Sequence, residues 1–108
     1  MANVMTTIGN AGSSGVTVTS GAAVSLASDF GFTAAQLANA ERALITATKA
    51  AVRYRYDDVA PTTEVGHLLP MDAAPPLEVL GNVNIKAMQF ILDAGAAVEA
   101  VVLVTLEW

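Results

Sequence analysis

Residues 98–108 read VEAVVLVTLEW and decide the fold class. Their even positions are apolar from Val98 to Trp108, whereas their odd positions are apolar only in the middle, at Val101 and Leu103. This alternation is typical of a β-strand, because successive side chains of a strand point to opposite faces of the sheet. Since both faces carry apolar groups, we expect the strand to be covered on both sides. Such cover implies a central position in its sheet or a second layer from another subunit.

Further strand-like segments, separated by turn residues, occur along the rest of the chain. We expect strands at residues 16–19, 22–27, 42–48, 51–56, 64–69, 77–80 and 85–92. The segment from Arg42 to Tyr56 is predicted to pair as a β-hairpin, and Gly81-Asn82 and Asp93-Ala94-Gly95 are predicted as hairpin links. About eight short strands with turns roughly every 8 to 12 residues predict an all-β fold, an antiparallel β-sandwich.

The N-terminal part of the chain has a different character. Residues 1–21 are rich in Thr, Ser, Gly and Asn and predict an extended polar N-terminal arm that contains one short strand. Thr33 and Gln36 have the spacing of a capping box, which predicts one short helical turn near Thr33 to Ala40. Residues 22–108 are then expected to form a single β-sandwich domain, as a length of 108 residues allows.

The composition is apolar and poor in charge, since 54% of the residues are hydrophobic, 14% are charged and the formal net charge is -5. Soluble domains usually have about a quarter of their residues charged, so we expect apolar surface that partner subunits bury. An acidic chain is a poor match for nucleic acid. The lack of Cys excludes disulfides and Cys-based zinc sites. No apolar stretch approaches the about 20 residues of a membrane helix. We therefore expect no nucleic-acid or membrane partner.

The sequence offers few groups for catalysis or metal binding. Its one histidine, His67, would serve as a general base, or as a metal ligand with Glu64 or Asp72, only with partners that are hard to find here. The acidic residues around Pro61 lack the alternating spacing of a calcium loop and are better explained as turn formers. We expect no catalytic, cofactor or metal site, and we expect His67 to be a structural residue at a strand edge.

The candidate partner-binding residues are Arg53, Arg55, Val101, Leu103 and Trp108. The two arginines project from one face of residues 51–56, and two interpretations stay open: docking to a partner, or ion pairing with nearby carboxylates. The other large aromatic and sulfur-containing side chains form no ladder at strand spacing. They are expected in the core or in an interface: Phe30, Phe32, Met71, Met88 and Phe90.

A series of short segments between Arg42 and Trp108 carries a resemblance to a known family. In chain order they are ALI (43–45), VRYRYDD (52–58), APT (60–62), VGH (65–67), Leu69, MQFI (88–91), AGA (94–96) and VLVTL (102–106). With them the chain resembles small virion proteins of tailed bacteriophages, of the capsid decoration or cement type. The resemblance implies a β-sandwich that binds the outer face of the major capsid lattice, commonly as a homotrimer.

Residues and resemblance together favour one function over two alternatives. We expect a non-enzymatic protein made in the host cytoplasm and located on the virion. Its partners are then the major capsid protein and further copies of itself, joined through the apolar strand face. The arm and the face that carries Arg53 and Arg55 are expected to dock onto capsomers. The first alternative is a tail, baseplate or head-fibre module. The second is a small carbohydrate-binding or hydrolytic domain, against which the lone His67 and the lack of an aromatic platform argue.

Overall fold

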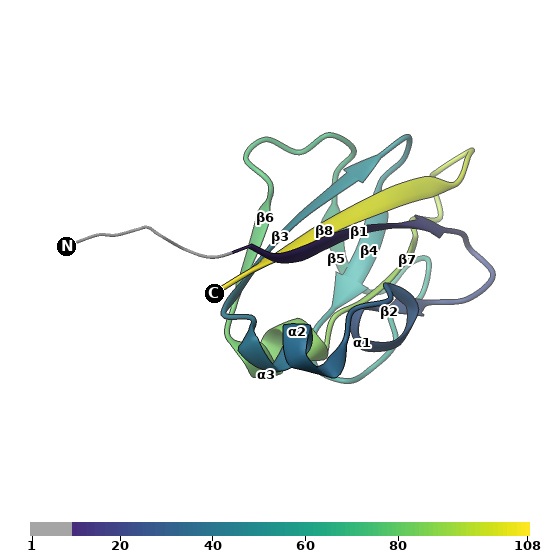
Figure 1. Ribbon diagram of the computed structural model, residues 1–108. Coiled ribbons are helices and arrows are strands. Elements are labelled where there is room, and N and C mark those ends of the chain that lie inside the picture. The colour runs from purple at the N-terminus through teal and green to yellow at the C-terminus, as the bar shows by residue number, and fades with distance from the viewer. Residues whose placement is uncertain (1–9) are drawn as a thin grey trace.

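Two antiparallel four-stranded sheets face each other in the computed structural model, which describes residues 10–108 (Figure 1). Sheet A has the order β1 (Asn10–Val18), β8 (Ala100–Glu107), β3 (Arg42–Thr48) and β6 (Leu77–Leu80). Sheet B has the order β2 (Val24–Ser25), β7 (Gln89–Leu92), β4 (Val52–Arg55) and β5 (His67–Leu69). The predicted antiparallel β-sandwich is confirmed.

Three short helices lie together at one end of the sandwich (Figure 1). They are α1 (Leu26–Asp29), α2 (Ala34–Asn39) and α3 (Asn82–Lys86). The predicted capping box starts α2, because the Thr33 hydroxyl accepts from the Gln36 amide at 3.1 Å and the Gln36 side chain accepts from the Thr33 amide at 2.8 Å. The side-chain amide of Asn82 donates to the carbonyl of Leu37 and so ties α3 to α2.

Apolar side chains from both sheets fill the space between them. The inward positions of β8 are fully buried: Ala100, Val102, Val104 and Leu106. Phe90 of sheet B is also fully buried, with its ring 5.8 Å from that of Phe30. Phe30, Met88 and Phe90, which were expected in the core or in an interface, lie in the core. Burial alternates along β3 and β8, so one face of sheet A is directed to the core that it shares with sheet B.

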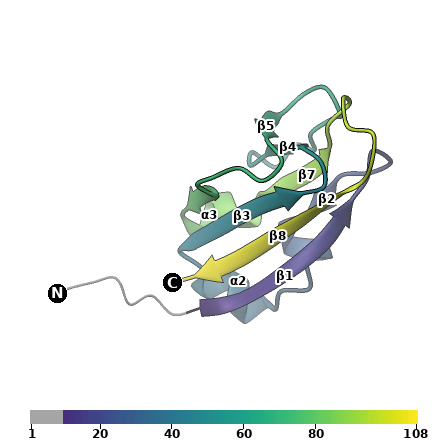
Figure 2. The ribbon, with the colours of Figure 1, turned by 90° about the horizontal axis from the view of Figure 1, so that it is seen from above.

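Strand β8 takes the central place that its pattern predicts, between β1 and β3. Its inner face is buried, but within residues 10–108 no element lies over its outer face, and Leu103 there remains 45% exposed. Figure 2 shows β1, β8 and β3 in front, with the helices and β7 behind them. The cover expected on this second side is therefore not supplied by the described part of the chain.

The predicted hairpin from Arg42 to Tyr56 is wrong. Strand β3 pairs with β8 and β6 in sheet A, whereas β4 pairs with β7 and β5 in sheet B. The chain crosses between the sheets at residues 49–51, where Lys49 has a φ of 72°. A hairpin would place the apolar faces of both segments side by side in one sheet. Crossing turns these faces toward each other, and each then buries the other.

Two other predicted links are also corrected. Asp93-Ala94-Gly95 joins β7 of sheet B to β8 of sheet A and so closes no hairpin. Gly81-Asn82 begins α3 instead of a hairpin, and the strand predicted over residues 85–92 starts only at Gln89. Gly81 has a φ of 92° and its carbonyl accepts from the amide of Ile85, so the backbone turns into a helix there.

Part of the predicted polar arm, residues 1–21, belongs to the sandwich, since residues 10–18 form strand β1. Strand β1 begins at Asn10 and pairs with β8 along its length, and Val18 at its end is fully buried. Its Gly, Ser and Thr residues do not prevent this pairing, because the backbone of β8 pairs with it from Glu107 to Ala100. Residues 1–9 of the predicted arm lie outside the described residues.

Candidate binding surfaces

Val101 and Leu103, two of the candidate residues, lie in the middle of the outer face of sheet A. Leu103 is flanked across the sheet by Gly15 of β1 and Thr46 of β3. A side chain added at Gly15 would come within 3.9 Å of both Leu103 and Val101, so the glycine leaves this side of both residues uncovered. Val101 is flanked in the same way by Thr17 and Thr48, so the neighbours of both apolar residues across the sheet are small and uncharged.

The charges of this outer face are gathered at one end. Arg42 of β3 forms ion pairs with Glu107 of β8 at 2.5 Å and with Glu78 of β6 at 3.2 Å. The hydrogen bond that Arg42 donates to Glu107 raises the pKa of Arg42 above its ordinary value. Arg42 is therefore a cross-strand tie between three strands, and the area around Leu103 carries no charge of its own.

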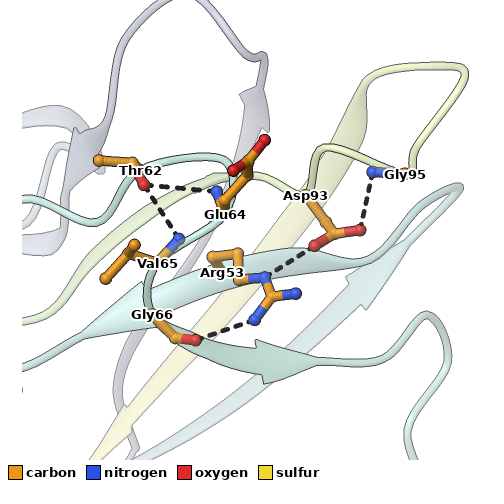
Figure 3. Close-up of polar contacts among 7 residues, drawn as sticks. All are labelled: Arg53, Thr62, Glu64, Val65, Gly66, Asp93 and Gly95. Carbon is orange, nitrogen blue, oxygen red and sulfur yellow. Dashed lines mark hydrogen bonds and ion pairs between the residues drawn. The ribbon is translucent and has the colours of Figure 1, made fainter.

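Arg53, the third candidate, binds to other residues of the same chain (Figure 3). Its Nε donates to Oδ1 of Asp93 at 2.7 Å and its Nη1 donates to the carbonyl of Gly66 at 3.1 Å. The other carboxylate oxygen of Asp93 accepts from the amide of Gly95 at 3.0 Å. The Arg53 guanidinium, helped by the Gly95 amide, lowers the pKa of Asp93 below its ordinary value. Arg53 thus connects β4 to the start of β5 and to the β7–β8 link.

Arg55 is paired as well. Its Nε and Nη2 donate to the two carboxylate oxygens of Asp57 at 3.0 and 2.5 Å, and this bidentate contact lowers the pKa of Asp57. Of the two interpretations left open for Arg53 and Arg55, ion pairing with nearby carboxylates describes both. Both side chains remain partly exposed, 28% and 29%, and docking to a partner through these ion pairs stays a prediction.

The five candidate residues do not form one site. Val101 and Leu103 lie on the outer face of sheet A, and Arg53 and Arg55 belong to β4 of sheet B, on the other side of the core. Trp108, which follows β8, is 48% exposed. One flat partner surface cannot contact both sheets, so the apolar pair and the arginine pair must be considered as separate surfaces.

An aromatic cluster that the sequence did not suggest lies where β4 and β5 pair. The register sets Tyr54 opposite His67, with ring centroids 5.3 Å apart, and the ring of Tyr56 is 6.0 Å from His67 and tilted by only 23°. Burial raises the pKa of Tyr54, whereas Tyr56 is 45% exposed. The only signal in the sequence was the alternation of Tyr54 and Tyr56, and its significance depends on which strand pairs with β4.

Two hollows adjoin this cluster and share Tyr56. The first has a volume of about 430 Å³ and is lined by Arg55, Tyr56, Asp57, Val65, Gly66 and His67. The second has a volume of about 340 Å³ and is lined by Tyr54, Tyr56, Leu77, Glu78, Val79, Leu80 and Asn84. Both volumes are within the range of small-molecule sites, about 300–1,000 Å³.

Within residues 10–108, no three His, Asp or Glu side chains gather in a way that could hold a metal ion. The ring neighbours of His67 are Tyr54 and Tyr56. The metal interpretation would need Glu64 or Asp72 beside it as a further ligand. No helix in the same described range is long and apolar enough to cross a membrane.

Comparison with known proteins gives no match of any kind: no family model, no curated protein and no solved structure matches the chain.

Proposed function

We propose that this protein is a non-enzymatic structural protein of a phage virion, which binds the outer surface of the capsid and stabilises the head lattice as a decoration protein. The observation that carries the proposal is the uncovered apolar area around Leu103 in the middle of sheet A. The central strand of a sandwich is where a monomer would be expected to place polar groups if its outer face met only water. The resemblance of residues 42–108 to phage decoration proteins supplies the setting.

The outer face of sheet A is well suited to repeated protein contacts. Around Leu103 it is uncharged, and Ser13 and Thr105 satisfy each other through a hydrogen bond of 2.7 Å. Removal of this apolar surface from water is favourable by about 25 cal/mol per Å², from which the loss of translational and rotational freedom on association is subtracted. In the proposed arrangement three copies associate through this face, and the trimer contacts the major capsid protein at several points at once. Linked contacts raise the avidity far above the affinity of a single contact.

The proposal is tested with heads of the encoding phage that were assembled without this protein. Purified wild-type protein is expected to sediment with these heads and to raise the temperature at which they lose their DNA. The Leu103→Arg variant is expected to lose both effects. Leu68→Arg is the matched control, because Leu68 is as exposed as Leu103, 49% against 45%, but lies in β5 of sheet B.

Three outcomes would contradict the proposal. They are a wild-type protein that does not bind heads, equal binding by Leu103→Arg, and loss of binding only in Leu68→Arg. Electron microscopy of complete virions adds the location. Density for this protein on the tail or baseplate would replace decoration by the tail-module alternative.

A further inference from the structure

Tyr56 lines two hollows, one bordered by residues of β5 and the other by residues of β6, and each of these strands is at the edge of its sheet. Its ring is stacked near His67 and remains 45% exposed. An exposed tyrosine ring offers an apolar face for stacking and a hydroxyl for hydrogen bonds. Because Tyr56 lines both hollows, a ligand of two or more linked units that contacts this residue can reach into both.

The first hollow is lined by groups that suit hydroxyls. Arg55 and Asp57 neutralise each other through two hydrogen bonds, so they add polarity to the hollow without net charge. The low pKa of Asp57 keeps this pair ionised at neutral pH. A carboxylate bound in this way keeps further lone pairs that accept hydrogen bonds from a ligand. Val65 and Gly66 add an apolar part to the lining.

The charges around the hollow argue against ionic ligands. Asp58 and Glu64 are exposed in the loop between β4 and β5, and the chain has a net charge of -5, so anions such as phosphates are repelled. A cation would have to compete with Arg55 for Asp57, because these two residues already form an ion pair. A neutral molecule with an apolar ring face and many hydroxyl groups has the complementary chemistry.

We propose that the two hollows lined by Tyr56 form a binding site for a neutral oligosaccharide, in which one sugar ring stacks on Tyr56 and its hydroxyls bond to the Arg55–Asp57 pair. The site binds without cleaving. Glycoside hydrolysis uses two carboxyl groups across the scissile bond, whereas the first hollow has Asp57 alone and the second has Glu78, which is paired with Arg42. This site is separate from the Leu103 face.

The test is a printed array of neutral and acidic oligosaccharides, followed by NMR titration of the full-length protein with the neutral oligosaccharide that gives the strongest signal. Amide signals of residues 55–57 and 65–67 are expected to shift. Tyr56→Ala is expected to weaken binding about threefold to tenfold, as the loss of one ring contact implies, while Tyr56→Phe retains most of it. Leu68→Ala, in the same strand as His67 but at an alternate position, is the control and is expected to bind normally.

The inference is overturned if no neutral oligosaccharide binds, if acidic oligosaccharides or a lysine-rich control peptide bind instead, or if the shifted signals lie elsewhere. Equal binding by Tyr56→Ala also overturns it. Signal mapping on the wild-type protein decides the question even if Tyr56→Ala fails to fold. Failure here leaves capsid binding untouched, because the head-binding experiment depends on Leu103 and this one on Tyr56.

Discussion

The outer faces of the two sheets meet water in different ways. On sheet B, Arg53 and Arg55 are both held by carboxylates of the same chain, Asp93 and Asp57. On sheet A, the residues around Leu103 are uncharged, and Leu103 itself is 45% exposed with no described element above it. Both sheets pair their arginines within the chain, but sheet B exposes its apolar Leu68 on the edge strand β5, whereas sheet A exposes Leu103 on the central strand β8.

This difference shows which kind of residue identifies an interface in such a small domain. Exposed arginines are obvious candidates for docking. An ion pair within the chain, however, balances the charge of the guanidinium with that of a carboxylate and fixes the geometry of the arginine. Apolar groups in the middle of a sheet have no such internal solution, because only another layer can remove them from water. The uncovered face of sheet A is therefore the stronger indication of a partner.

The largest effect on the free energy of unfolding is expected from a substitution in the core between the two sheets. Phe90→Ala deletes a fully buried ring between the sheets and is expected to lower the free energy of unfolding by about 3–5 kcal/mol. Leu68→Ala, on a side chain that is 49% exposed, is expected to change it by less than about 0.5 kcal/mol. Urea denaturation followed by circular dichroism measures both. Equal losses would mean that the inner and outer faces of sheet B are wrongly assigned.

A smaller effect concerns the ion pairs of sheet B in acid. The pKa of Asp93 is below its ordinary value of 3.8 in the folded protein, so the unfolded chain binds the proton more readily. The pair with Arg53 therefore contributes stability above that pH, and the contribution is lost as the pH falls through the lower, folded pKa. Arg53→Met is expected to flatten this acid-induced fall in stability.

Arg55→Met is the control for this acid effect. The Asp57 side chain is 53% exposed against 19% for Asp93, so solvent screens the Arg55 pair more strongly. In urea midpoints measured between about pH 6 and about pH 2, Arg53→Met is expected to flatten the acid dependence of stability more than Arg55→Met does. A steeper acid dependence in Arg53→Met than in the wild type would contradict the role given to Arg53.

Much of the fold could be predicted from single segments. Strands β3 and β6 match their predicted bounds, and the capping box at Thr33 starts a helix as its spacing implies. These features depend on local periodicity and on hydrogen bonds a few residues apart. Strand partners depend instead on which apolar faces cover each other, so the hairpin predicted from Arg42 to Tyr56 became a crossing between sheets.

The candidate site divides along the same line. That Val101 and Leu103 share one face followed from alternation along a single strand. That Arg53 is bound to Asp93, and that His67 lies between two tyrosines, depends on pairings between strands far apart in the chain. No spacing rule within one segment contains this information, and for that reason the aromatic cluster was missed.

The measurement that tests the central claim most directly is the mass of the protein in solution, by size exclusion with light scattering over a range of concentrations. We expect the wild type and Leu68→Arg to form a trimer of three 11.1 kDa chains. We expect Leu103→Arg to be a monomer whose free energy of unfolding changes by less than about 0.5 kcal/mol from that of a wild-type monomer. A wild type that stays monomeric throughout, or a Leu103→Arg variant that assembles like it, would contradict the assignment of the outer face of sheet A as an interface.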